Sequence, residues 1–306
     1  MYIRTNPILN VLFKPLVLFC EWLGTHFPET LVRIRYFVRF KRFLRLDNPQ
    51  TLNEKILYLS LRTDTSLWTK CADKYAVREY VHDCGLDDIL IPLYGVWEKA
   101  DEIDFAKLPE KFVMKTTHGS GDIVVVKNKN ELNVKRVVYS FNRLLSKPYG
   151  ALEGGKHYMR IKPKVIVEAL LQNDERDERL SSSLVDYKIW CINGIPRYIW
   201  ACYNRSSKGQ DNALFDTCWN DCSYYLVYND HYRRPTVQLP KPSCLAQMLD
   251  VARKISTNIP VLRCDLYAIG NRVYFGEMTF TSNGGMMFNY TEEFQEMLGR
   301  ETLLPN

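Results

Sequence analysis

Two hydrophobic periods alternate along this chain of 306 residues. Some segments repeat apolar residues at helical spacing, while others are short runs rich in Val, Ile and aromatic residues, which are typical of strands. This mixture predicts an α+β fold. The helix-like segments span residues 51–61, 68–85, 131–146 and 244–256. The strand-like runs span residues 88–97, 112–116, 122–126, 164–171, 186–192, 196–203 and 261–280, and a polar segment follows residue 203.

The turn residues between strand-like runs predict hairpins. Asn193 and Gly194 separate two such runs, and Gly270 and Asn271 divide residues 261–280 in the same way. Both pairs tolerate the positive φ angles that tight two-residue turns require. We therefore expect neighbouring strands in this half of the chain to run antiparallel.

The first 46 residues carry the whole formal net charge of +6, with eight Lys and Arg against two Glu. The rest of the chain sums to zero, so it lacks the basic groove that a nucleic-acid-binding protein needs. Within residues 31–46, large apolar side chains recur at helical spacing while Arg35, Arg39 and Arg42 fall on another face; the apolar residues are Tyr36, Phe37, Phe40, Phe43 and Leu44. This pattern is typical of a helix lying on an anionic membrane and also of a helix packed on its own protein.

The nine cysteines form no CxxC pair, and the chain does not start with a signal-peptide pattern. We therefore expect reduced thiols and a cytoplasmic protein. Cys218 and Cys222 lack a second Cys or His pair at zinc spacing, so we interpret them as core residues. The apolar run from residue 6 is interrupted by Lys14 and Pro15 and is too short to span a bilayer comfortably.

Residues 112–126, FVMKTTHGSGDIVVV, place a glycine-bearing loop between two strand-like runs. Gly119 and Gly121 flank Ser120, so the backbone N–H groups can approach anionic oxygens closely. A P-loop or a dinucleotide fold requires a helix after such a loop, whereas DIVVV predicts a strand. We interpret the loop as a hairpin lid over phosphates whose charge Lys115 neutralises; a plain structural turn is the alternative.

Two carboxylates and an arginine are predicted to share one face of the hairpin at 261–280. Arg263 and Asp265 lie two residues apart on one strand, and the turn brings Glu277 alongside. Magnesium usually takes one or two carboxylates plus phosphate oxygens, and arginine stabilises a transferring phosphoryl group. The alternative is an ordinary cross-strand salt bridge.

The apolar run VIVEALL, residues 165–171, contains Glu168. A strand of this kind between two lobes can offer backbone groups to the edge of a purine and apolar walls to its faces. Glu168 is equally consistent with a solvated strand end.

Taken in order, these motifs resemble the TupA-like ATP-grasp family of bacterial surface polysaccharide gene clusters. In the ATP-grasp fold, two α+β lobes hold ATP between antiparallel sheets. The segments that carry the resemblance are NPQTLNEKILYL, DKYAVREYV, IPLYGVW, FVMKTTHGSGD, VIVEALL, DYKIWCING, RCDLY and YFGEMTF. We expect a basic helical extension at 1–46, a helix-and-strand subdomain at 47–110, a nucleotide-binding lobe at 111–171 and a metal-binding C-terminal lobe at 172–306.

The resemblance implies roles in ATP binding for individual residues. Lys115 would reach the α- and β-phosphates, residues 118–121 would close over the β- and γ-phosphates, and Arg78 would contact phosphate. Residues 168–171 would bind adenine, and Asp186 sits where a ribose-binding acid often lies. The implied nucleotide-binding set is Arg78, Lys115, His118, Gly119, Ser120, Gly121, Glu168, Ala169, Leu170, Leu171 and Asp186.

The resemblance also implies a metal site and a pair of catalytic cations. Asp265 and Glu277 would hold Mg²⁺, while Arg263 and Lys115 would support the transferred phosphoryl group. Many ATP-grasp enzymes have Asn two residues after the second acid, whereas this chain has Thr279. A hydroxyl is a poorer metal ligand, which puts a second magnesium in doubt.

The chemistry implied by the resemblance is ATP-dependent activation of a carboxylate, followed by attack of an amine to form an amide. The implied substrates are an amino acid and a uronic-acid-containing sugar of a capsule or related polysaccharide. The basic segment 1–46 suits an enzyme resting on the inner face of the cell membrane. The alternatives are a sugar kinase, a glycosyltransferase, for which the chain lacks an Asp-x-Asp pair, and a nucleotide-binding protein without activity.

Overall fold

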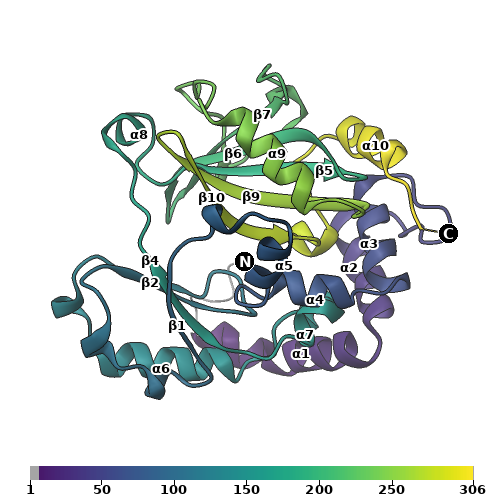
Figure 1. The fold of residues 1–306 in the computed structure, drawn as a ribbon. Helices are drawn as coiled ribbons and strands as arrows, with labels where there is room; N and C mark the ends of the chain where they lie inside the picture. The colour runs from purple at the N-terminus through teal and green to yellow at the C-terminus, as the bar shows by residue number, and fades with distance from the viewer. Residues whose placement is uncertain (1–6, 306) are drawn as a thin grey trace.

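The computed structural model describes the backbone of residues 7–305 and the side chains of residues 13–174 and 178–305. Its strands form two sheets, and Figure 1 shows the larger sheet above the smaller one. The smaller sheet has the order β1-β4-β2-β3, with β1 at Leu93–Trp97, β2 at Phe112–Thr116, β3 at Ile123–Val126 and β4 at Val165–Ala169. The larger has the order β10-β9-β5-β6-β7-β8, with β5 at Asp186–Ile192, β6 at Ile195–Ser206, β7 at Gly209–Asp216, β8 at Tyr232–Arg233, β9 at Val261–Ile269 and β10 at Arg272–Thr279.

Helices cover both sheets and build the N-terminal part of the described chain (Figure 1). All described strand pairs are antiparallel except β7–β8. The α+β prediction is therefore confirmed. The helices are α1 (Pro7–His26), α2 (Pro28–Phe40), α3 (Leu52–Arg62), α4 (Ser66–Ala72), α5 (Val77–Asp83), α6 (Val134–Leu145), α7 (Lys156–Met159), α8 (Glu175–Leu180), α9 (Leu245–Ile255) and α10 (Glu292–Glu301).

The four-stranded sheet has a small core and an open edge. Phe112 and Met114 of β2 pack with Phe141 of α6, which lies along one face of this sheet (Figure 1). β3 is the edge strand, and its Ile123 and Val125 are exposed. The β2–β3 hairpin is therefore held to the rest of the protein mainly through β2.

The six-stranded sheet contains both hairpins that the turn residues predict. Asn193 and Gly194 have φ angles of 51° and 78°, and they join β5 to β6. Gly270 has a φ of 57° where β9 turns into β10. Positive φ at these positions is what a tight hairpin turn requires, so both predictions are confirmed.

The polar segment after residue 203, for which the sequence pattern indicated no element, also forms strands. β6 continues to Ser206 and pairs with β7, whose polar residues include Gln210 and Asn212. These two side chains are buried, and Asn212 accepts hydrogen bonds from Gln210 and from the Trp200 indole. A buried strand can therefore be polar when its groups bond one another, and such a strand lacks the apolar pattern that would identify it.

The helix predicted over residues 68–85 is two helices, α4 and α5, separated by a break at residues 73–76. The side chain of Asp73 accepts hydrogen bonds from the backbone N–H groups of Tyr75 and Ala76, and Asp73 itself has extended backbone angles. These local bonds compete with the helical pattern and stop α4. The break exposes Lys74 to the space between the two sheets.

Both N-terminal helices pack on the body of the described chain. Val32 and Tyr36 of α2 are buried in a cluster with Leu57 of α3 and with the segment after α2. The helix predicted to continue toward Leu44 ends at Phe40, because Lys41 takes the left-handed conformation with a φ of 57°. The aromatic side chains expected on one face do not share one environment, because Tyr36 is buried while Phe37 is exposed.

Candidate active site

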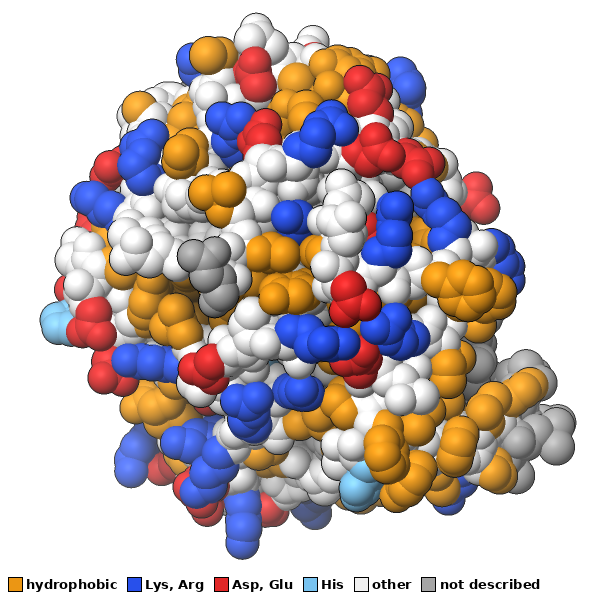
Figure 2. All heavy atoms as spheres, turned by 90° about the vertical axis from the view of Figure 1, so that its right-hand side faces the viewer, with side chains coloured by type: hydrophobic (Ala, Val, Ile, Leu, Met, Phe, Trp, Pro, Cys, Tyr) orange, Lys and Arg blue, Asp and Glu red, His pale blue; other side chains and the backbone are white. Residues whose placement is uncertain are grey.

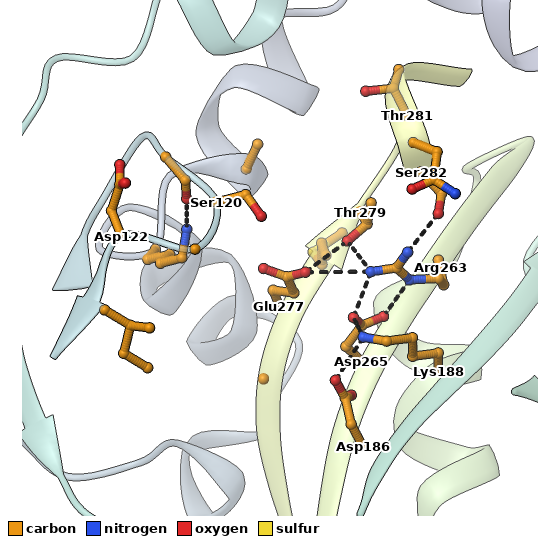
Figure 3. Close-up of a pocket in the computed structure, with 18 of the residues that line it drawn as sticks. Ser120, Asp122, Asp186, Lys188, Arg263, Asp265, Glu277, Thr279, Thr281 and Ser282 are labelled. Atoms are coloured by element: carbon orange, nitrogen blue, oxygen red, sulfur yellow. Dashed lines mark hydrogen bonds and ion pairs between the residues drawn. The ribbon is translucent and has the colours of Figure 1, made fainter. Parts of the chain in front are cut away.

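A cavity of about 480 Å³ lies where the two sheets face each other. Lys115 of β2 and Asp265 of β9 both line it, so the glycine hairpin and the acidic strands meet in one space. Figure 3 shows the hairpin residues on one side and the strands β5, β9 and β10 on the other. The charged and hairpin residues around it are Lys74, Lys115, Gly119, Ser120, Gly121, Asp122, Glu153, Asp186, Lys188, Arg205, Arg263, Asp265 and Glu277.

Arg263 is the centre of the hydrogen-bond network on the strand side (Figure 3). Its Nε and one terminal nitrogen donate to the two carboxylate oxygens of Asp265, at 2.7 and 2.6 Å. The same terminal nitrogen donates to Thr279 at 3.0 Å and reaches Glu277 at 3.4 Å, while the other donates to Ser282 at 2.6 Å. Because Arg263 is buried and every terminal nitrogen is bonded, its orientation toward the cavity is fixed.

Lys188 links two of the carboxylates in this network. Its Nζ lies 2.7 Å from Asp186 and also donates to Asp265. Arg205 donates to the same Asp186 oxygen at 2.6 Å. Positive and negative groups thus alternate across three neighbouring strands.

The register of the strands explains why these side chains meet. Residues two apart on a strand point to the same face, which brings Asp186 together with Lys188 and Arg263 together with Asp265. Lys188 lies opposite Asp265 in the β5–β9 pair, and Glu277 lies opposite Asp265 in the β9–β10 pair. A bulge at Gly276 precedes Glu277, and a Cβ there would lie 2.8 Å from the carbonyl oxygen of Asp265. Glycine therefore permits the close approach that places Glu277.

The network changes the proton affinity of its members. Burial alone would raise the pKa of Glu277, but Lys74, Lys188 and Arg263 outweigh it and hold that pKa below its ordinary value. Burial would lower the pKa of Lys188, but Asp186 and Asp265 raise it above the ordinary lysine value. Near neutral pH, Lys188 is accordingly a cation and Glu277 an anion.

The hairpin side of the cavity is built mainly from backbone. Gly121 has a φ of 79°, and a Cβ on Gly119 would lie 2.2 Å from a carboxylate oxygen of Asp122. The backbone angle of Gly121 therefore favours glycine, whereas a side chain at residue 119 would displace the Asp122 carboxylate. Lys74 donates to the carbonyl oxygen of Gly119, and Lys115 bonds Glu168 at 2.7 Å. Burial lowers the pKa of Lys74, and the nearby Glu277 opposes that shift.

Several predicted nucleotide-binding residues lie outside the lining of this cavity. Arg78 donates to the carbonyl oxygen of Ile91 at 2.9 Å and lies 3.6 Å from Glu168. The His118 ring is buried against Tyr149, and its Nδ1 has no partner among the described residues. Glu168, near the end of β4, bonds Lys115, and residues 169–171 follow it along the chain. Their roles in nucleotide binding stay predictions.

Sequence reasoning missed two lysines of this cavity. Lys188 stands two residues after Asp186 on a strand-like run, and this spacing was a usable signal. Lys74 gave no such signal, because it reaches the cavity only through the break between α4 and α5. Tyr149, Glu153 and the residues after β10 also line the cavity and come from segments without a regular pattern.

Comparison with protein families gives a match over most of the chain. The family described as TupA-like ATPgrasp matches residues 54–303. The chain belongs to this family. Its two sheets are the two α+β lobes of an ATP-grasp fold, as the sequence motifs predict. A search of curated proteins found no match.

Solved structures resemble this ATP-grasp chain at low sequence identity. The D-alanine–D-alanine ligase from Helicobacter pylori is 15% identical with a TM-score of 0.43, and the match covers 82% of this chain and 67% of that one. The ATP complex of the enzyme from Bacillus anthracis is 12% identical with a TM-score of 0.45, covering 74% and 60%. Phosphoribosylamine–glycine ligase from Thermotoga maritima is 12% identical with a TM-score of 0.40, covering 69% and 48%. The chain spans about half to two thirds of the length of these proteins.

The donor set of this ATP-grasp cavity fits one magnesium ion completed by phosphate oxygens. Among the described residues, no cluster of three or more His, Cys, Asp and Glu is arranged to hold a metal. Glu277 uses one carboxylate oxygen for Arg263 and Thr279, and no described residue bonds the other. Asp265 keeps one lone-pair site after its bonds to Arg263 and Lys188. Two partly free carboxylates match the usual protein share of a magnesium site.

Thr279 holds charged side chains in place and does not act as a metal ligand. Its hydroxyl donates to Glu277 at 3.1 Å and accepts from Arg263 at 3.0 Å. The residue that replaces the usual Asn thus positions the two charged groups, and its oxygen is already engaged. The donors present fit one ion better than two.

Proposed function

We propose that this protein is an ATP- and Mg²⁺-dependent carboxylate–amine ligase that joins an amino acid to a uronic-acid carboxylate in bacterial surface polysaccharide biosynthesis. The observation that carries the proposal is the single cavity lined by Lys115, the Gly119–Gly121 hairpin and the Arg263–Asp265–Glu277 network. Membership of the TupA-like ATP-grasp family supports the reaction class. The amino acid and the sugar acid follow from the resemblance of the motifs alone.

The proposed reaction has two steps. A substrate carboxylate oxygen takes the terminal phosphoryl group of ATP, which gives an acylphosphate and ADP. An amine then attacks the acyl carbon, the C–N bond forms, phosphate leaves with the C–O bond electrons, and the amine loses a proton. Mg²⁺, when bound, would neutralise phosphate charge beside Glu277 and Asp265.

The residues of the chain supply orientation and charge to these steps. Lys74 and Lys115 face the cavity from the hairpin side and would balance the negative charge of the phosphates. Arg263 is held by Asp265 in one orientation, so it can stabilise the phosphoryl group in transfer without reorganising. The hairpin would cover the phosphates and exclude water that hydrolyses an acylphosphate.

We place the acid substrate at the end of the cavity formed by β6, β7, β8 and the turn after β10. Arg205, Gln210, His231, Tyr232 and Asn283 line this end. An aromatic ring beside hydrogen-bonding groups suits a sugar, and Arg205 suits its carboxylate. This end lies across the Asp186–Lys188 pair from the hairpin, so a carboxylate there would approach the phosphoryl group near Lys188.

A phosphate-release screen tests the proposal. Amino acids are crossed with uronic acids, sugar nucleotides and oligosaccharides at fixed MgATP, and products are identified by mass spectrometry. A ligase releases phosphate only when acid and amine are both present, and the product mass equals their sum minus water. A kinase instead leaves phosphate on the sugar without an amine, which would overturn the ligase assignment.

Matched variants connect the activity to the cavity. Glu277→Gln keeps the shape of the side chain and removes its charge, so we expect turnover to be lost. Asp250→Asn removes an exposed carboxylate of α9 that pairs with Lys254, and it should leave turnover unchanged. Equal activity of the two variants would contradict the proposed site.

A further inference from the structure

The outer face of α1 is apolar and has no partner among the described residues. Leu18, Phe19 and Trp22 recur at helical spacing and are exposed, Phe19 by 55% and Trp22 by 49%. Phe27, just after the helix, adds a further exposed aromatic ring. Large apolar side chains gathered in this way mark an interaction surface when they adjoin one another.

Packing on the opposite face fixes this orientation. Gly24 is buried against the short helix at residues 151–153, and a Cβ on Gly24 would lie 1.7 Å from the carbonyl oxygen of Ala151. Trp22 stands two residues earlier, about 200° around an α-helix, and so points away from the body. A rotation of α1 that buried Trp22 would break the Gly24 contact.

The exposed rings form one continuous cluster. The ring of Trp22 lies 6.1 Å from that of Phe19 and 5.6 Å from that of Phe27. Figure 2 shows hydrophobic side chains gathered at the lower right of its face, with Lys and Arg side chains elsewhere on the same face. We define the apolar strip as Leu18, Phe19, Trp22 and Phe27.

The two helices at the N-terminal end of the described chain carry an excess of positive charge. Residues 13–46 hold seven Lys and Arg against two Glu, whereas residues 47–306 are balanced. Three of the arginines pair with glutamates and one bonds a backbone carbonyl, which leaves Lys14, Arg39 and Lys41 as exposed cations with no carboxylate partner among the described residues. Lys14 is exposed one helical turn before Leu18, and Lys41 is exposed at the end of α2. No described helix is long and apolar enough to cross a bilayer, so a membrane contact of the described chain would be parallel to the surface.

We infer that the apolar strip docks the protein on an anionic lipid bilayer, with α1 lying in the interface. Aromatic rings are well suited to the headgroup level, and neighbouring lysines attract anionic lipids. This inference does not depend on the reaction in the cavity. It locates any reaction there at a membrane surface, within reach of lipid-linked substrates.

Vesicle sedimentation of the full chain tests the inference. The protein is mixed with vesicles of phosphatidylcholine alone or with added phosphatidylglycerol, and the bound fraction is measured. We expect binding to the anionic vesicles that weakens with salt. Phe19→Glu with Trp22→Glu should lower the affinity by at least about tenfold, since two rings leave the interface and two negative charges are added.

A control pair carries the same change in charge at other exposed apolar positions. Tyr139→Glu with Val237→Glu alters α6 and a loop, both outside the apolar strip, and should keep binding close to the original level. Urea unfolding confirms that each variant folds. Substitution is preferable to truncation, because deletion of residues 1–46 removes the buried Leu31, Val32 and Tyr36.

Three outcomes would overturn the inference. The first is no sedimentation of the unaltered protein with anionic vesicles, and the second is full binding by the Phe19/Trp22 variant. The third is a concentration-dependent dimer, seen by analytical ultracentrifugation, that the same variant dissociates while vesicles bind neither protein. That result would assign the apolar strip to a second copy of the chain.

Discussion

The two walls of the cavity are built on different principles. On the six-stranded wall, Asp265 accepts hydrogen bonds from both Arg263 and Lys188, and all three are buried in a sheet with an extensive apolar core. On the hairpin wall, Lys74 bonds a backbone carbonyl and Lys115 bonds one glutamate, and the supporting core is small. One wall is a network of paired charges, and the other is a loop on an edge hairpin.

The two walls suit two different requirements of phosphoryl transfer. Charges that are already oriented stabilise a transition state without reorganisation, which requires a rigid support. A cover over the phosphates must open and close, and segments with few buried apolar contacts open at lower free energy. We therefore expect substitutions on the network wall to change stability and turnover together, and substitutions on the hairpin wall to change turnover alone.

The largest expected effect follows from Asp265→Asn. Asp265 is buried and neutralises both Arg263 and Lys188, so its replacement leaves two buried cations with less compensation. Breaking a buried ion pair typically costs about 3–5 kcal/mol. Urea unfolding should show a loss in the free energy of unfolding of this size, accompanied by loss of turnover.

Asp250→Asn provides the matched control for this measurement. Asp250 pairs with Lys254 at 2.9 Å on the exposed face of α9, where an ion pair contributes up to about 1 kcal/mol. A loss for Asp265→Asn no greater than that of Asp250→Asn would contradict a network wall that depends on paired charges.

The next prediction concerns Lys115→Met on the hairpin wall. Methionine keeps much of the side-chain length, and the buried Glu168 retains Arg78 at 3.6 Å as a partner, so the loss in free energy of unfolding should be smaller than that of Asp265→Asn. Removing one charged group from a phosphoryl-transfer site should lower kcat/KM for MgATP by about a hundredfold or more. Phosphate release and urea unfolding measure the two quantities. A loss of stability as large as that of Asp265→Asn would remove the distinction between the walls.

Sequence reasoning predicted the network wall better than the hairpin wall, and the physical reason is periodicity. Side chains two apart on a strand share a face, so Arg263, Asp265 and Glu277 could be placed together from their spacing and one turn. The same rule applied to Asp186 would have added Lys188. On a regular strand, the spacing of residues in the sequence determines which side chains share a face.

Other features that sequence reasoning missed depend on irregular backbone or on tertiary contacts. The position of Lys74 depends on the break that Asp73 makes between two helices. The strand β7 can bury the polar side chains of Gln210 and Asn212 because they bond each other. The inward packing of His118 depends on Tyr149, which is distant in sequence. Each of these features is set by tertiary contacts, and none has a period in the sequence that would reveal it.

The smallest of the expected effects concerns His157 of α7, which precedes β4. Its ring packs against the stacked pair of Trp68 and Phe280, and neither ring nitrogen has a partner among the described residues. Burial lowers the pKa of His157 to about 3. The unfolded chain therefore binds a proton more readily than the folded one between the ordinary histidine pKa of about 6.5 and this lowered value.

The sign of the pH dependence follows from that difference. Stability is complete above the unfolded pKa and falls on acidification, by about 2 kcal/mol at pH 5 for a single group of this kind. Urea unfolding of the protein and of His157→Leu at pH 7.5 and pH 5 isolates the contribution, because leucine does not titrate and the shared carboxylates cancel. The unaltered protein should lose about 2 kcal/mol more than the variant over this interval. Equal losses would mean that the ring finds a proton acceptor or water in the folded state.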